Sequence, residues 1–281
     1  MPVAVVTDST AHLPDGFAER HGIRVVPLHV LIDGESGLDG VDIGPPELSK
    51  AFAQRRVVTT SRPTPQEMAA VYRELLEGGA DGVVSVHLSR ELSATWESAW
   101  LATQEVDVER VRIVDSRTVG MGLGFAVLKA AGDAAAGAAP ADVEAAAVDT
   151  AARTSTFFVV ETLEHLRRGG RIGPAAALLG TALSVKPVLH VDDGQIVPLE
   201  KVRTMSRALA RLVDLAARAA AGRPVDIAVH HLAAPERAAE LATELDELVP
   251  TSSGCVVTEL GGVIGAHTGP GVVGVVVSPR D

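Results

Sequence analysis

Two short segments rich in hydroxyl side chains are the residues of this sequence best suited to binding an anion. The first holds Thr60 and Ser61, just before the helix-start pattern Thr64-Pro65, and the second is Ser93-Ala94-Thr95. We expect each to lead into a helix, with Ser93 or Glu91 as the candidate cap of the second, because unpaired N–H groups at helix starts favour negative charge. Neutral O–H donors also hold a carboxylate without placing a second charge in an apolar pocket. Taken singly, a segment of this kind is more often a plain helix cap.

Three side chains in the second half of the sequence are candidate partners for such an anion. Arg171 follows the glycine pair at 169–170, and Arg203 follows a predicted strand. His267 lies in the glycine-rich stretch 265–271, where glycines allow the backbone to approach a ligand closely. Each of the three, considered alone, also fits a surface charge or a loop residue.

Several motifs of catalysis and cofactor binding do not occur in the sequence. It contains no Gly-Lys-Ser/Thr loop, no Gly-x-Ser-x-Gly turn and no His-Glu-x-x-His. Residues 269–274 have Gly-x-Gly-x-x-Gly spacing, but the valines that follow predict a strand where a dinucleotide site requires a helix. The nine histidines are scattered and Cys255 is the single cysteine, so we predict no metal site and no cofactor.

An enzymatic alternative rests on two aspartates at the ends of predicted strands. Asp8 and Asp115, with His267, could supply acid–base chemistry for a small carboxylated or phosphorylated metabolite. Capping of turns explains the same two aspartates without catalysis. A protein-interaction or regulatory module is a third hypothesis.

The composition restricts the partners. A formal net charge of −11 argues against nucleic acid, which is bound by neutralising its phosphates, and against an anionic membrane surface. Aromatic residues make up only 3%, so any pocket is lined mainly by aliphatic side chains. The apolar run at the N-terminus lacks a basic flank, and no window approaches the ~20 apolar residues of a membrane span. We therefore expect a cytoplasmic protein with no integral membrane segment.

The first half of the sequence alternates between predicted strands and predicted helices. Apolar runs predict strands at residues 3–6, 23–31, 82–88 and 111–114. Turn signals at Asp33-Gly34 and Asp39-Gly40 predict a small β excursion over about residues 28–43. This alternation is typical of a parallel sheet with helices on both faces, in which ligands lie beyond the carboxyl ends of the strands.

The pattern changes near residue 160. Beyond it, the sequence predicts a mixed sheet with helices packed on one face, including a hairpin at residues 192–194. We therefore predict a two-domain α/β protein. Residues 1–160 form a parallel-sheet α/β/α domain, and residues 161–281 form a mixed-sheet α+β domain.

These segments, in this order, resemble the DegV family of fatty-acid-binding proteins over nearly the whole chain. Residues 5–10 resemble the family's opening strand and turn, 60–65 its Thr-Ser-Gln-Pro-Ser-Pro segment, and 88–96 its Leu-Ser-Gly-Thr-Tyr segment. The later matches are Val114-Asp115-Ser116, Arg168-Gly169-Gly170-Arg171-Ile172, Lys186-Pro187, Lys201-Val202-Arg203 and the stretch 265–271.

The resemblance implies a fatty acid buried in a tunnel that the C-terminal domain closes. At the carboxylate it places Thr60, Ser61, Ser93, Ala94, Thr95 and His267. At the mouth around the head group, or against a partner, it places Arg62, Arg171 and Arg203. Whether Thr60 or Ser61 makes the hydrogen bond is left open.

The resemblance also implies a role without catalysis. The protein binds a long-chain fatty acid and presents its carboxylate to a separate ATP-dependent fatty-acid kinase, whose acyl phosphate feeds phospholipid synthesis. The chain is then a carrier and not the phosphoryl-transfer catalyst. Three departures concern head-group geometry and chain selectivity: Arg62 replaces a glutamine, Ala94 a glycine and Trp96 a tyrosine.

Overall fold

Continuous runs of aliphatic residues form a four-stranded parallel sheet in the first half of the chain. The structure, a computed structural model, describes residues 2–178 and 185–280. The sheet has the strand order β2-β1-β6-β7. Its strands are β1 (Val3–Asp8), β2 (Ile23–Val26), β6 (Gly82–His87) and β7 (Val111–Asp115). All of its pairings are parallel, as the sequence predicts.

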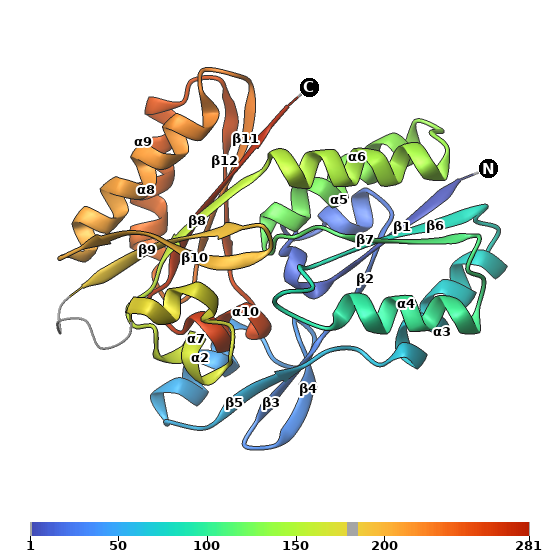
Figure 1. Ribbon diagram of the computed structural model, residues 1–281, viewed down its shortest axis with the longest axis horizontal. Coiled ribbons are helices and arrows are strands. Elements are labelled where there is room, and N and C mark those ends of the chain that lie inside the picture. The colour runs from blue at the N-terminus through green and yellow to red at the C-terminus, as the bar shows by residue number, and fades with distance from the viewer. Residues whose placement is uncertain (1, 179–184, 281) are drawn as a thin grey trace.

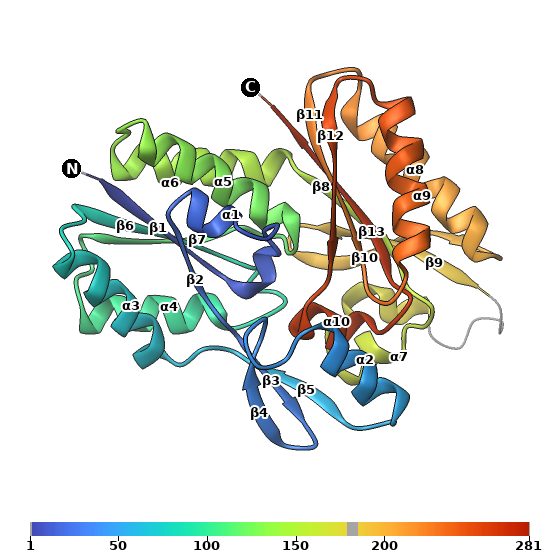
Figure 2. The ribbon, with the colours of Figure 1, turned by 180° about the vertical axis from the view of Figure 1, so that it is seen from behind.

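Helices cover both faces of this sheet (Figures 1 and 2). One face packs on α3 (Pro65–Glu77) and α4 (Thr95–Glu105). The other packs on α5 (Met121–Ala135) and α6 (Pro140–Arg153), close to the short turns η1 (Ser9–Ala11) and α1 (Phe17–Arg20). Thr64 caps α3 in a capping box with Glu67, which confirms the predicted helix start. The prediction of helices on both faces is therefore confirmed.

The predicted β excursion is present, and it contains a third strand that the sequence analysis missed. Strands β3 (His29–Ile32) and β4 (Glu35–Leu38) form an antiparallel hairpin, and β5 (Val58–Ser61) pairs with the other edge of β3. Helix α2 (Pro45–Ala53) connects β4 to β5. Thr60 and Ser61 therefore lie on a strand and not in a turn. The β-branched run Val57-Val58-Thr59-Thr60 favours this extended conformation.

A six-stranded mixed sheet forms the second half, with the strand order β10-β9-β8-β13-β11-β12. The strands are β8 (Ser155–Val159), β9 (Lys186–Asp192), β10 (Gln195–Val202), β11 (Val225–His231), β12 (Ser252–Glu259) and β13 (Val273–Pro279). Among the described pairings of this sheet, only β11–β12 is parallel. Because β8 belongs to this sheet, the chain passes from one large sheet to the other just after α6. The domain boundary at residue 160 stays a prediction.

Two amphipathic helices pack on the outer face of the six-stranded sheet, while its inner face turns toward the first half. The outer helices are α8 (Met205–Ala220) and α9 (Pro235–Leu248), which bury a core of valine, leucine and alanine side chains. The inner face meets α5 through Met121, Phe125, Ala228 and Val276. None of the described helices is long and apolar enough to cross a membrane.

Three short helical segments complete the junction between the halves: α7 (Glu164–Arg168), η2 (Gly173–Leu178) and α10 (Gly262–Thr268). The views in Figures 1 and 2 agree that α2, α7 and α10 lie together. The glycines of residues 265–271 predict a loop, whereas residues 262–268 are helical. Glycines are needed there for packing, since a Cβ at Gly262 would lie 2.7 Å from Val30 and one at Gly265 would collide with Leu48.

Candidate functional site

A narrow cavity runs between the inner face of the six-stranded sheet and the first half of the chain. It encloses about 930 Å³ of atom-free space, part of it open to solvent, and about 110 Å³ admits the centre of a water molecule. Its walls are mostly aliphatic and aromatic: Leu28, Leu88, Leu92, Val119, Phe157, Phe158, Leu166, Val191, Ile196, Leu260, Val263, Ile264, Val272, Val275 and Val276. A narrow apolar channel of this kind suits an extended alkyl chain better than a compact polar molecule.

Polar side chains from both halves of the protein also line the cavity, and two of them are hydrogen-bonded to each other. Thr60 Oγ1 on β5 lies 2.8 Å from His267 Nε2 on α10. Ser61, the next residue of the strand, also lines the cavity but is exposed, and neighbouring residues of a strand point to opposite faces. The structure thus brings together Thr60 and His267, which are 207 positions apart in the sequence.

Arg171 connects the two hydroxyl-bearing segments. Its Nε donates to the carbonyl oxygen of Leu92 at 2.9 Å, and its Nη1 donates to that of Gly169 at 2.6 Å. Leu92 directly precedes Ser93, and Gly169 packs against His267. The guanidinium therefore holds the Ser93 segment against the end of α7 and keeps a positive charge beside the cavity.

His267 is neutral at physiological pH in this environment. Burial, followed by the nearby charge of Arg171, lowers the pKa of His267 to about 4. A neutral ring protonated at Nε2 donates to Thr60 Oγ1, which frees the threonine hydroxyl to donate to an anion in the cavity. Within residues 2–178 and 185–280, Nδ1 is buried without a hydrogen-bond partner.

Helix α10, which carries His267, is fixed at its other end by Asp39. The N–H of Gly262 donates to Asp39 Oδ1 at 2.7 Å, and Ser9 Oγ donates to Asp39 Oδ2 at 2.8 Å. Asp39 is only 3% exposed. A carboxylate at the first turn of a helix stabilises it through the free N–H groups and the helix dipole. The sequence marks Asp39 only as a turn residue, because its partners are far away in sequence.

The second hydroxyl segment differs from the expected cap. Ser93 lines the cavity, and its Oγ lies 2.9 Å from Thr95 Oγ1. The N-cap of α4 is Ala94, with φ −80° and no side-chain cap, so the prediction of a cap by Ser93 or Glu91 is wrong. The same φ shows that alanine fits here without left-handed strain. Ala94 and the buried Thr95 are not among the described residues that line the cavity.

Of the two remaining predicted arginines, the structure brings one to the cavity. Arg62 is exposed and lines the cavity next to Ser61. Arg203 follows the far end of β10, whereas the near end is the hairpin where the Gly194 carbonyl accepts from Ser89 Oγ at 2.8 Å. Arg203 is not among the described lining residues.

Gly274 forms the floor of the cavity. In the sheet register it lies directly opposite Phe158 on β8 and His230 on β11, and all three line the cavity. Glycine inside a central strand often marks close approach of a ligand. His230 is neutral, since burial, with smaller contributions from His12 and His231, lowers its pKa to about 3. Its Nε2 accepts from the N–H of Met121 at 2.9 Å.

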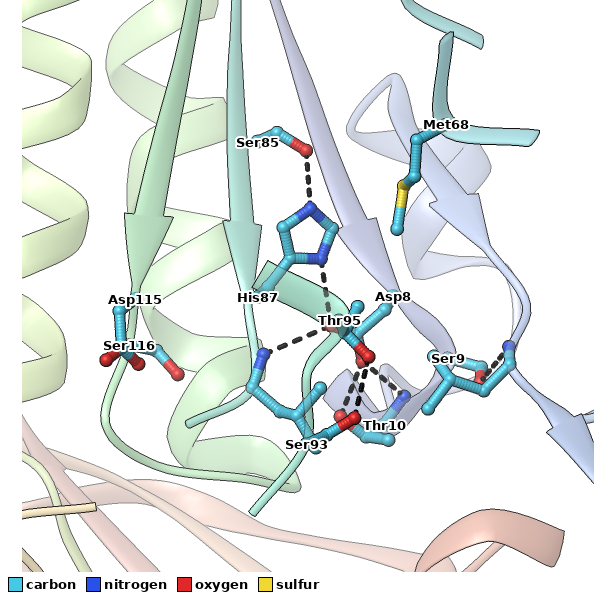
Figure 3. A network of polar contacts seen from close by, with 12 residues as sticks. Asp8, Ser9, Thr10, Met68, Ser85, His87, Ser93, Thr95, Asp115 and Ser116 are labelled. Carbon is cyan, nitrogen blue, oxygen red and sulfur yellow. Dashed lines mark hydrogen bonds and ion pairs between the residues drawn. The ribbon is translucent and has the colours of Figure 1, made fainter. Parts of the chain in front are cut away.

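A fully buried polar network supports the cavity wall from within the parallel sheet (Figure 3). Asp8 Oδ2 lies 3.0 Å from His87 Nδ1, and His87 Nε2 lies 2.7 Å from Ser85 Oγ. The hydroxyl of Tyr72 donates to Ser85 Oγ at 2.9 Å. The other oxygen of Asp8 accepts from the N–H and hydroxyl of Thr10, a cavity residue, at 3.0 and 2.6 Å. The sequence of β6 gave no sign of this network. Every residue of β6 is buried, so its polar residues do not mark a solvent-exposed face.

The two aspartates of the enzymatic alternative have structural partners. Besides His87 and Thr10, Asp8 accepts from the N–H of Leu88 at 3.1 Å. Asp115 Oδ1 accepts from the N–H groups of Arg90 and Arg117 at 3.3 and 2.9 Å, which is turn capping. The described residues contain no group of three or more His, Cys, Asp or Glu side chains suited to a metal ion.

The two α/β halves enclose a narrow apolar cavity with hydroxyl, imidazole and guanidinium groups on its wall, an arrangement suited to an amphipathic anion. The sequence model of the family described as "Uncharacterised protein, DegV family" matches residues 2–280. The chain belongs to this family, which confirms the resemblance seen in the sequence.

Two relatives match over nearly their full length. A DegV domain-containing protein of Streptomyces coelicolor is 54% identical over 278 residues, covering 99% of both chains. Protein DegV of Bacillus subtilis is 36% identical over 278 residues, covering 98% of both.

Solved structures confirm the predicted fold class. A DegV family protein of Thermus thermophilus, described as binding fatty acid, has a TM-score of 0.94 and 36% identity, with 100% of both chains covered. DegV of Bacillus subtilis, described as a fatty acid binding protein, has a TM-score of 0.91 and 35% identity, again with 100% of both chains covered.

Proposed function

We propose that this protein binds a long-chain fatty acid in the narrow cavity, with the carboxylate at Thr60, Ser93, His267 and Arg171. The observation that carries the proposal is that the Thr60–His267 pair lies on the wall of the apolar channel. There it offers a hydroxyl donor beside a neutral imidazole. Structural relatives described as fatty-acid-binding support it. Thr60 is the better candidate than Ser61, because it faces His267 whereas Ser61 is exposed.

The alkyl chain supplies most of the affinity. Each buried methylene contributes ~0.8 kcal/mol, so a tail of about 16 carbons gains on the order of 10 kcal/mol before the costs of ordering are subtracted. The polar groups orient the head and prevent a buried unpaired charge. Arg171 compensates the carboxylate, while its own geometry is already fixed by two carbonyl oxygens.

We further propose that the protein acts as a carrier and not as a catalyst, and presents the carboxylate to a separate ATP-dependent kinase that makes an acyl phosphate for phospholipid synthesis. The engagement of Asp8 and Asp115 in capping and buried hydrogen bonds supports a role without acid–base catalysis. The cytoplasmic location remains a prediction from the sequence.

Mass spectrometry of an organic extract from natively purified protein tests the binding role. We expect a stoichiometric fatty acid, and Ser93→Ala is expected to weaken its affinity about tenfold while the cavity still fills, because one hydrogen bond to a charged group is lost. Ser36→Ala on exposed β4 is the matched control and should bind like the wild type. An empty protein that also fails to take up added fatty acid would overturn the proposal.

A further inference from the structure

The inner face of the six-stranded sheet carries three rows of side chains, and the fatty-acid cavity reaches only the second. The strand registers and the alternation of side chains along each strand define the rows. From the end nearest α10 they are Phe158, Gly274 and His230, then Thr156, Val276 and Ala228, and last Ser278 and Asp226. Thr156 and Val276 line the cavity, whereas the third row is absent from the cavity lining that the structure describes. Successive rows lie two residues, or about 6.7 Å, apart along a strand.

Two side chains of α5 close the cavity at the second row. Helix α5 lies between the two large sheets, where Met121 and Phe125 pack in one apolar cluster with Val276 and Ala228 (Figure 2). Met121 is fully buried and Phe125 is 9% exposed. Residues four apart in a helix lie on the same side, so the two side chains form one surface, which we call the end wall. Gly120, which directly precedes Met121, lines the cavity, so the end wall begins where the cavity lining ends.

A second hollow lies behind the end wall, and we call it the outer hollow. It encloses about 1160 Å³ of atom-free space, part of it open to solvent. Phe125, Leu128 and Val256 give it an apolar side, and the third row of the sheet also lines it. The outer hollow and the fatty-acid cavity share none of their described lining residues. Because Phe125 borders the outer hollow and packs with the cavity residue Val276, a single layer of side chains separates the two spaces there.

We propose that Phe125 of the end wall sets the longest fatty-acid tail that the cavity holds. This inference rests on the proposed function. While the tail is shorter than the cavity, each further methylene is buried and raises the affinity about fourfold. A methylene that reaches the end wall must displace the packed ring of Phe125, and overpacking of this kind cancels the gain. The affinity should therefore rise with chain length up to one limit and then stop rising.

Removal of the ring should move this limit to longer tails. In Phe125→Ala the cavity opens into the outer hollow, whose lining continues along the sheet to the third row. The further row adds about 6.7 Å, which accommodates about four more methylene groups. Beyond them the tail meets Asp226, whose Oδ1 accepts from Ser253 Oγ at 2.8 Å. An alkyl chain gains nothing by displacing water from such a polar pair, so the limit should move by one row and no further.

Competition binding with saturated, unbranched acids of about 12 to 24 carbons tests the proposal. Each acid displaces a fluorescent dye, and the measured quantity is the chain length at which the affinity stops rising. We expect this limit to lie about four carbons later in Phe125→Ala than in the wild type. An acid of that length should bind Phe125→Ala at least about tenfold more tightly than the wild type. Phe125→Leu leaves more of the core filled and should move the limit by fewer carbons.

Leu123→Ala is the matched control. Leu123 is fully buried on the same helix, but it packs against the parallel sheet and lines neither space. It should reduce the free energy of unfolding in urea melts, as Phe125→Ala does, and leave the limit unchanged. If Phe125→Ala does not fold, Phe125→Leu decides alone. An unchanged limit in the Phe125 variants, the same shift in Leu123→Ala, or a wild-type affinity that rises through the whole series overturns the proposal. A wild type that binds none of the acids contradicts the proposed function itself.

Discussion

Gly169→Ala should weaken fatty-acid binding by displacing His267 without touching the ligand. The backbone of Gly169, φ −74° and ψ −8°, accepts alanine without strain. An added Cβ, however, would lie 2.7 Å from His267 Cε1 and closer still to Nδ1, whereas real Cβ atoms stay beyond 3.0 Å. The ring must shift or tilt by about 1 Å, and a displacement of that size disrupts the 2.8 Å hydrogen bond between Nε2 and Thr60.

Loss of that oriented contact should cost about 1 kcal/mol of binding free energy, so hexadecanoate affinity falls roughly fivefold. Overpacking should also reduce the free energy of unfolding by about 1–3 kcal/mol. Titration calorimetry and urea unfolding measure the two effects. Gly170→Ala is the control, because its φ of +71° strains the backbone while its Cβ meets nothing within 4 Å. It should lower stability and leave the affinity unchanged.

A double-mutant cycle decides whether the effect passes through the imidazole. In a His267→Ala background the ring is absent, so Gly169→Ala should no longer weaken binding. An equal loss of affinity in both backgrounds would refute the reasoning, because the methyl group would then be acting on something other than His267.

Two further predictions concern the floor of the cavity and the buried histidines. Gly274→Leu should displace about four methylene groups of the tail and weaken long-chain binding about 100-fold. Gly132→Leu on the exposed surface of α5 is the control. Unchanged affinity of Gly274→Leu in a dye-displacement assay would contradict the placement of the tail. Since the pKa values of His230 and His267 are lowered to about 3 and about 4 in the folded state, the unfolded chain binds more protons below pH 6.5. The contribution of these two histidines to the free energy of unfolding should therefore be full above pH 6.5 and fall as the pH drops toward 4. In urea melts at pH 7.5 and 5, His230→Asn should lose less stability between the two pH values than the wild type. An identical loss in the variant would count against His230.

Local patterns predict the large elements of this fold well. The aliphatic runs of β1, β6 and β7 and the capping box at Thr64 depend on neighbours in sequence, and each is where it was expected. Strand β5 and helix α10 depend on distant partners: β5 is ordered by pairing with β3, and α10 by Asp39 and by glycines that admit Val30 and Leu48. No local signal reports such contacts.

The candidate site likewise contains residues that the sequence predicts and residues whose position depends on distant contacts. Residue type and the order of motifs indicate Thr60, Ser93, Arg171 and His267, and the structure gathers them at one cavity. The position of Arg203 depends on how far β10 carries the chain away from its hairpin, and that distance is set by the tertiary structure.

The buried network of the parallel sheet bears on how active sites are recognised from coordinates. Asp8, His87 and Ser85 stand in the acid–imidazole–hydroxyl order of a serine hydrolase, with contacts of 3.0 and 2.7 Å. Yet Ser85 is fully buried, and its oxygen already accepts the hydroxyl proton of Tyr72. No scissile bond can reach this serine. The three residues therefore stabilise the contact between β1 and β6. A search by distance alone would classify the protein as a hydrolase. Solvent access to the serine is the measurement that distinguishes a catalytic triad from a buried structural network.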